Sequence, residues 1–141
     1  MDLHSKRLKL RTFENKDKES LIDLLNDKEV SKWTERIPFP YLEKHADWWI
    51  NNKPVNEHVY AIIKRDEGYL IGGTNISIKG EIGCWIGRSY WNQGFATETI
   101  EIITKFGFET MKLLKIGLPI SYLFLAIIIV SGENAGAIHF T

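Results

Sequence analysis

The stretch that decides the fold is CWIGRSYWNQGFATETI, from Cys84 to Ile100, because its character changes halfway along. Its first residues are apolar enough for a buried strand, and its last residues carry charges at helical spacing. Between them lies a turn that contains Gly94 but no proline and no acidic residue. The stretch therefore predicts a strand that passes through a glycine-containing turn into a helix.

Such a turn is a candidate anion site. The first amides of an α-helix have no partner inside the helix, and the positive end of the helix dipole lies behind them, so phosphate groups bind there. Gly94 would let the backbone approach an anion closely, Ala96 would keep the next turn narrow, and Thr97 would add a hydroxyl. Taken alone, the same pattern also fits ordinary architecture.

Working outward, the residues before this stretch predict further strands. RLKLRTF, residues 7–13, alternates as a half-buried strand does. The apolar runs at 59–65 and 69–78 are separated by residues 66–68, Asp-Glu-Gly, which favour a hairpin turn. EIGCWIG, residues 81–87, is apolar on both faces, which indicates a central strand.

Helical patterns fill most of the remaining chain. Leucine spacing predicts a helix within 14–33 with an exit at Asn26-Asp27, a second helix lies within 42–52, and a third follows Gly94 with a broad apolar face. The connector at 34–41 contains two prolines and should be an exposed loop. Its aromatic residues and their neighbour either pack on the core or form a substrate-facing wall: Trp33, Phe39 and Tyr41.

Composition limits the possible classes of protein. With 141 residues, 44% of them hydrophobic, the chain can bury one sizeable core, and we expect a single domain over residues 1–141. The 18 basic and 18 acidic residues cancel, so no overall field attracts nucleic acid. The single cysteine excludes an internal disulfide, and the four histidines lack ligand spacing, so no metal is indicated. The N-terminus has no signal-peptide core, which favours the cytoplasm.

EIGCWIGRSYWNQGFATETI, residues 81–100, resembles the acetyl-CoA-binding segment of the GNAT acetyltransferases, in particular the branch that acetylates ribosomal-protein N-termini and related amines. The resemblance extends to RLKLRTF, LNDKEVSKW and VYAIIKRDEGYLIGG, and covers roughly residues 7 to 112. It implies an α/β (α+β) fold of the GNAT type, with a mixed, mostly antiparallel central sheet flanked by helices.

The resemblance also implies acetyl-CoA as co-substrate and an amine acceptor as partner. In the family the turn amides hold the coenzyme pyrophosphate, and the backbone of the preceding strand pairs with the pantetheine arm. The residues implied here are Cys84, Trp85 and Ile86 on the strand, Arg88 near it, Gln93, Gly94, Phe95, Ala96 and Thr97 in the turn, and Asn134 in a later motif. Trp91 stands where the wider superfamily prefers Gln or Arg.

Acetyl transfer from a thioester to an amine needs the neutral amine, because an ammonium has no lone pair, and free amines mostly hold their proton at neutral pH. Glu81 matches a glutamate near the reacting carbon in this branch. It would act as the catalytic base, directly or through water, if burial made its carboxylate basic enough. The alternative is a strand-end carboxylate paired with a lysine. An amide near Trp85 would stabilise the oxyanion, and the thiol of Cys84 is interpreted as packing.

Past residue 112 the resemblance weakens. ENAGAIHFT, residues 133–141, matches only the beginning of a family motif, so we expect a GNAT domain that lacks the last strands. The run from Ile116 to Val130 holds no charge but is shorter than the about 20 residues of a membrane-spanning helix, so a buried strand is favoured over a tail anchor. Its exposed edge would favour a homo-oligomer.

The sequence thus predicts an N-acetyltransferase that acts on a primary amine, either a protein N-terminus or a small amine. Two alternatives stay open. One is an acetyl-CoA-binding protein with impaired catalysis, and the other is a tail-anchored protein without enzymatic activity.

Overall fold

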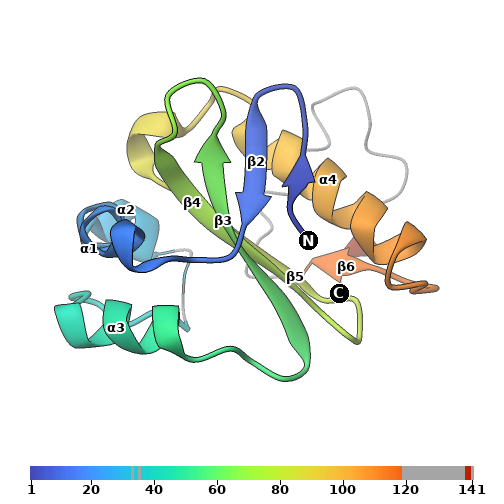
Figure 1. Ribbon diagram of the computed structural model, residues 1–141, viewed down its shortest axis with the longest axis horizontal. Helices are drawn as coiled ribbons and strands as arrows, with labels where there is room; N and C mark the ends of the chain where they lie inside the picture. The colour runs from blue at the N-terminus through green and yellow to red at the C-terminus, as the bar shows by residue number, and fades with distance from the viewer. Residues whose placement is uncertain (33, 35, 119–138, 141) are drawn as a thin grey trace.

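The centre of the computed structural model is an antiparallel sheet of five strands in the order β1-β2-β3-β4-β5 (Figure 1). The structure describes residues 1–32, 34, 36–118 and 139–140. The strands are β1 (Leu3–His4), β2 (Leu8–Arg11), β3 (Glu57–Lys64), β4 (Leu70–Ser77) and β5 (Ile82–Ile86). The predicted sheet is confirmed. Of these five strands only β1 was not predicted, because two residues are too few to show alternation.

Helices cover both faces of this sheet. Their bounds are Lys18–Leu25 for α1, Lys28–Ser31 for α2, Glu43–Asn51 for α3 and Phe95–Glu109 for α4, with short 3₁₀ turns η1 at Asn15–Asp17 and η2 at Arg88–Tyr90. Helices α1, α2 and α3 lie together on one face and α4 crosses the other (Figure 1). The break between α1 and α2 falls at the predicted exit, where Asp27 caps α2 by accepting from the amide of Glu29 at 2.9 Å.

The predicted hairpin joins β3 to β4. The amide of Gly68 donates to the carbonyl of Lys64 at 2.8 Å, and Gly68 has a left-handed φ of +75°. The antiparallel register that follows pairs Ala61 with Gly73 and Val59 with Asn75. This hairpin forms the middle of the sheet, on which the remaining elements pack.

Each face of the sheet has its own hydrophobic core. The core under α4 includes Leu8, Leu10, Ile62, Ile71, Ile76, Ile82, Cys84, Ile86, Ile100 and Ile103. The core under α1 to α3 includes Leu21, Leu25, Val30, Tyr41, Ala46, Ala61, Ile63 and Leu70. Because side chains alternate along a strand, Cys84 and Ile86 of β5 pack toward α4, while Trp85 packs toward the opposite face.

Strand β5 is the last of the five, and the next strand meets only its beginning. Glu81, just before β5, forms a parallel bridge with Gly117, whose amide donates to the carbonyl of Gly80 at 2.9 Å. Gly117–Leu118 forms β6, which pairs in parallel with β7, His139–Phe140. Past that bridge, no strand of the described residues pairs with the outer edge of β5. The prediction that residues 81–87 form a central strand is therefore wrong for the part of the chain that the structure describes, where β5 is the last strand of its sheet. Its residues are apolar on both faces because helices cover both sides of the sheet.

Some expectations concern residues that the structure does not describe. They are the substrate role of Trp33, the coenzyme role of Asn134, and the strand expected between Ile116 and Val130, of which the structure describes only the part up to Leu118. In the part of the chain that is described, none of the helices combines the length and the apolar character that a bilayer span needs.

Candidate active site

The turn before α4 brings a row of backbone amides together. Gly94 has φ +81° and ψ 6°, a left-handed conformation that favours glycine, and α4 begins at the next residue. Within the described residues, the amides of Gln93, Gly94, Phe95, Ala96 and Thr97 donate no hydrogen bond to the protein. Unpaired amides at the positive end of a helix dipole suit a phosphate group. The coenzyme role of these five residues stays a prediction, with the geometry in its favour.

A cation that the sequence analysis did not single out lies against this turn. Arg7, in the loop between β1 and β2, donates from Nη1 to the carbonyl of Gln93 at 2.8 Å and stacks 4.3 Å above the ring of Phe95. A Cβ atom on Gly94 would lie 3.2 Å from Nη2 of Arg7. The glycine therefore leaves room for the guanidinium, whose charge adds to the positive potential of the helix N-terminus.

Glu98, in the first turn of α4, holds this arginine in place. Its carboxylate accepts from Nε of Arg7 at 2.7 Å, from the amide of Arg7 at 3.0 Å, and from the hydroxyl of Ser5. Burial by itself would raise the pKa of Glu98, but the hydrogen bonds from Ser5 and Arg7 outweigh it and lower that pKa. The carboxylate therefore stays ionised and anchors the β1–β2 loop to the turn before α4.

Arg88, which the family resemblance assigned to the coenzyme, has a different contact. Its Nη1 atom lies 3.5 Å from Oδ1 of Asp27, and 60% of its side chain is exposed. Of the two arginines, Arg7 is thus the one held against the turn. Contact between Arg88 and the coenzyme stays a prediction.

Strand β5 presents its backbone groups alternately to β4 and to its outer edge. The register pairs Trp85 with Gly73, and a Cβ atom on Gly72 would lie 2.2 Å from the carbonyl oxygen of Trp85. The backbone of Trp85 thus points at β4. An oxyanion donor in this region would have to be the amide of Cys84 or of Ile86, because these two point to the outer edge.

Trp91 covers the end of that edge. Its indole Nε1 donates to the carbonyl of Ile86 at 2.7 Å, and its ring packs against both hydrophobic cores. Trp91, which departs from the superfamily pattern, therefore uses the carbonyl of Ile86 on the outer edge of β5 as its hydrogen-bond acceptor. The groups left for a pantetheine arm are the amide of Ile86 and the amide and carbonyl of Cys84.

The thiol of Cys84 is buried on the α4 side of the sheet, where only 5% of the residue is exposed. Desolvation raises the pKa of Cys84 to about 12, although a hydrogen bond with Thr74 works in the opposite direction. A thiol that keeps its proton at neutral pH is not a nucleophile. This agrees with the packing role expected for the side chain, and it argues against an acetyl-cysteine at this position.

Glu81, the expected base, is exposed at the start of β5. Its amide donates to Oγ of Ser77 at 3.1 Å and its carbonyl accepts from the amide of Ser77 at 2.9 Å, so the backbone here is well held. No lysine or arginine among the described residues pairs with its carboxylate. Neither the burial nor the ion pair considered from the sequence is therefore found. By alternation Glu81 shares the face of Trp85, about 13 Å away along the strand.

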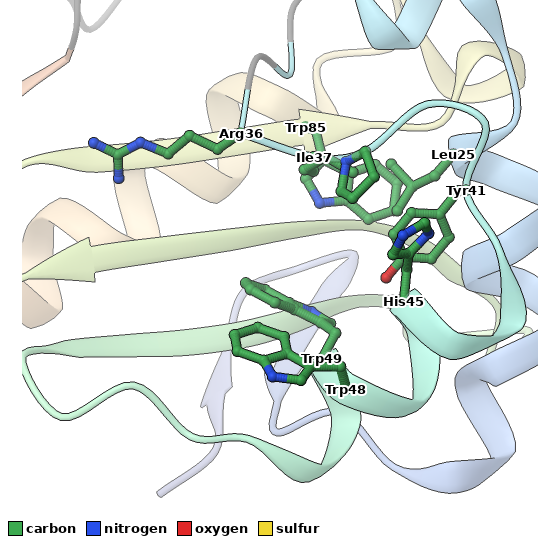
Figure 2. Close-up of a pocket in the computed structure, with 9 residues that line it drawn as sticks. Leu25, Arg36, Ile37, Tyr41, His45, Trp48, Trp49 and Trp85 are labelled. Atoms are coloured by element: carbon green, nitrogen blue, oxygen red, sulfur yellow. The ribbon is translucent and has the colours of Figure 1, made fainter.

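An aromatic pocket lies on that same face, between the sheet, α3 and the loop after α2. Its volume is about 310 Å³. It is lined by Leu25, Arg36, Ile37, Pro38, Tyr41, His45, Trp48, Trp49 and Trp85. In Figure 2 the two tryptophans of α3 lie across the pocket from Ile37 and Trp85. Of the aromatic residues proposed for substrate, Tyr41 lines this pocket, whereas Phe39 does not and is 44% exposed.

Tyr41 is held rigidly at the pocket wall. Its amide donates to Oδ1 of Asn26 at 2.6 Å and its carbonyl accepts from Nδ2 of the same residue at 2.7 Å. Its ring contacts that of His45 at a tilt of 40°, with 5.7 Å between ring centres. Tyr41 is 4% exposed, and desolvation raises its pKa to about 12, so the hydroxyl stays neutral. Within the described residues that hydroxyl has no hydrogen-bond partner.

One glycine of β4, Gly73, makes room for the opposite wall of the pocket. A Cβ atom on Gly73 would lie 2.5 Å from Nε1 of Trp85, so the indole rests directly on the sheet only because this position is glycine. His45 contributes a ring whose Nδ1 accepts from the amide of Leu42 at 2.9 Å.

Most of this pocket was missed in the sequence. Its residues come from three separate places between Leu25 and Trp85, so no motif joins them. One signal was present, because adjacent residues of a helix project about 100° apart, so one of Trp48 and Trp49 had to lie outside the buried face. Trp48 is indeed 62% exposed.

Comparison with known proteins agrees with the fold. The family model described as an acetyltransferase (GNAT) domain matches residues 7–134. An uncharacterised N-acetyltransferase of Bacillus subtilis, YnaD, is 33% identical over 122 residues, which are 82% of this chain and 71% of that protein. Because the family match spans most of the chain, the protein belongs to the GNAT acetyltransferases.

Solved structures share the architecture. An acetyltransferase of the GNAT family from Bacillus anthracis aligns with a TM-score of 0.69 and 28% identity, over 80% of this chain and 69% of that chain. A spermidine N-acetyltransferase from Vibrio cholerae in complex with CoA and spermine aligns with a TM-score of 0.63 and 21% identity, over 79% and 70%. The second likeness shows the fold alone.

Proposed function

We propose that this protein transfers the acetyl group of acetyl-CoA to the nitrogen of a primary amine, at a protein N-terminus or on a small molecule. Family membership supports the reaction class. The observation that carries the proposal is the turn from Gln93 to Thr97, where unpaired amides, a left-handed glycine and the guanidinium of Arg7 converge. A diphosphate carries two negative charges or more, and these groups are the kind that bind it.

If the coenzyme binds at that turn, the outer edge of β5 and the aromatic pocket take up the rest of the reaction. The outer edge of β5 offers the amides of Cys84 and Ile86 to the pantetheine arm and to the developing oxyanion. The aromatic pocket lies on the face to which Trp85 of the same strand projects, so it would hold the acceptor beside the thioester. Coenzyme and acceptor would thus meet along one strand.

In the transfer itself, a carbon–nitrogen bond forms between the acetyl carbonyl and the amine while the carbon–sulfur bond of the thioester breaks. The amine loses a proton and the departing sulfur gains one. We assign the first proton to Glu81 through a chain of water molecules, because its carboxylate is exposed and lies too far along the strand for contact with an amine in the pocket, either directly or through one water. The chain's own thiol takes no part, since Cys84 is buried and protonated.

Calorimetry with acetyl-CoA tests the coenzyme half of the proposal, and release of free thiol in the presence of an amine tests the transfer. We expect Gly94→Asp to weaken acetyl-CoA binding by at least about tenfold, because it places a carboxylate against a phosphate. Wild-type protein that does not bind acetyl-CoA would overturn the proposal. If acetyl-CoA binds but no primary amine causes release of its thiol, the protein binds the coenzyme without catalysing transfer.

A further inference from the structure

We infer that the aromatic pocket selects an amine that is flanked by a large apolar side chain and by a carboxylate or carbonyl oxygen, and that it rejects polyamines. Such an acceptor is an apolar α-amino acid, either free or as the first residue of a peptide. This inference rests on the proposed function and adds the class of acceptor.

The size and lining of the pocket indicate the apolar group. Three indole rings, from Trp48, Trp49 and Trp85, face one cavity together with Ile37. The volume of about 310 Å³ is at the small end of ligand pockets and suits one large side chain. Trp48 is 62% exposed, a large apolar surface that a bound side chain would cover.

The polar groups of the pocket indicate an oxygen acceptor next to the amine. Tyr41 is only 4% exposed. Its hydroxyl points into the pocket and has no hydrogen-bond partner among the described residues (Figure 2). Arg36 extends away from the tryptophans at one end of the pocket and forms no ion pair with the described residues (Figure 2). A guanidinium binds carboxylate or carbonyl oxygens.

The charge of the pocket argues against polyamines. Arg36 is the only formally charged side chain among its described lining residues, and none of these is a carboxylate. A polyamine would bring a second and third positive charge next to that guanidinium without compensation. Glu57, a carboxylate on the same face of the sheet, lines a different cavity and accepts from Nδ2 of Asn75 at 3.1 Å.

Four acceptors test this inference: phenylalanine, a phenylalanyl peptide, phenethylamine and spermidine. Phenylalanine has the apolar side chain and a carboxylate, and the peptide has the same side chain with a carbonyl in place of the carboxylate. Phenethylamine has the apolar group but neither a carboxylate nor a carbonyl, and spermidine has only amines. Thiol release from acetyl-CoA gives kcat/KM for each. Calorimetry with phenylalanine and with spermidine, in the absence of acetyl-CoA, measures binding to the pocket independently of transfer.

We expect the better of phenylalanine and the peptide to exceed both phenethylamine and spermidine by about tenfold or more, the effect of one charge-assisted hydrogen bond. The ranking of the first two identifies a free amino acid or a peptide N-terminus as the source. Arg36→Gln should remove most of the preference over phenethylamine, whereas the matched control Lys105→Gln, on the exposed side of α4, should keep it. Trp48→Ala should weaken binding of all aromatic acceptors, and Tyr69→Ala, an exposed aromatic outside the pocket, should not.

Failure of the inference and failure of the proposed function give different results. Efficient acetylation of spermidine, or an unchanged preference in Arg36→Gln, would overturn the acceptor class while acetyl transfer stands. Calorimetric binding of phenylalanine without thiol release would support the pocket and contradict the transfer. Absence of both binding and turnover with the two phenylalanine acceptors would overturn the inference.

Discussion

The carboxylate of Glu98 and the guanidinium of Arg7 lie 2.7 Å apart although 91 residues separate them in the chain. Through this contact the loop between β1 and β2 holds the first turn of α4, and the same arginine reaches the carbonyl of Gln93 at 2.8 Å. The turn before α4 is therefore held in place by a segment outside its own motif. Its geometry depends on a segment near the N-terminus.

Replacing Glu98 with Gln should weaken the turn more than the fold. The variant loses the charge on the hydrogen bonds to Arg7, which at a half-buried site costs about 1 kcal/mol of unfolding free energy. We expect a higher KM for acetyl-CoA, with a smaller change in kcat. Glu109→Gln, at the exposed C-terminal end of the same helix, is the control. Equal KM values for Glu98→Gln and wild type would show that Arg7 does not need this anchor.

The same pair makes stability depend on pH. The pKa of Glu98 is lower in the folded state than its ordinary value of 4.5, because the hydrogen bonds from Ser5 and Arg7 outweigh burial. Its contribution is therefore complete above pH 4.5 and is lost as the pH falls through the lower, folded-state pKa. The stability difference between wild type and Glu98→Gln should shrink as denaturation is measured at successively lower pH. A difference that does not change with pH in this range would contradict the assignment.

Gly94→Ala tests the glycine of the turn against a matched position. Gly94 and Gly68 have φ of +81° and +75°, so alanine should cost about 1 kcal/mol at each. Only at position 94 would the new Cβ atom meet a neighbour, at 3.2 Å from Arg7, whereas at position 68 nothing lies within 4 Å. Both variants should lose similar stability, and only Gly94→Ala should lose affinity for acetyl-CoA. Weaker coenzyme binding in both would indicate a general effect of unfolding.

Cys84→Ala should keep acetyl transfer. The thiol is buried, and burial raises its pKa to about 12, so it does not supply a nucleophile. Removing one sulfur atom from the core under α4 should cost about 1 kcal/mol of stability. Native protein should resist alkylation by iodoacetamide at pH 8 for the same reason. A folded variant without turnover, or an acetylated Cys84 in mass spectrometry, would contradict direct transfer.

Glu81→Gln addresses the base. If Glu81 accepts the amine proton, the variant should lose turnover most at moderately low pH, where the neutral amine is scarce, while its affinity for acetyl-CoA stays close to that of wild type. Asp66→Asn, in the exposed β3–β4 turn, is the control for loss of one surface carboxylate. A pH–rate profile identical to that of wild type would leave Glu81 with a structural role through its backbone bonds to Ser77.

Local chemistry explains which elements could be predicted from the sequence. Gly68 after Asp66-Glu67 predicts the hairpin because glycine adopts the left-handed turn conformation without strain. Asn26-Asp27 predicts the break between α1 and α2, since Asp27 caps the second helix. The apolar face that follows Gly94 predicts α4, and its residues Ile100 and Ile103 are fully buried. Each signal lies within a few residues, over which backbone preference and periodicity act.

The sequence by itself determined four of the five strands of the central sheet, the helices and the turn with its glycine, because each depends on neighbours in the chain. Only the tertiary structure decided that Arg7 lies against Gly94, that Trp85 rests on Gly73, and that both tryptophans of α3 face the same pocket. These contacts depend on the register of the sheet and on how α3 packs against it. A pattern read along one segment carries no information about which distant side chain will fill the space that a glycine leaves.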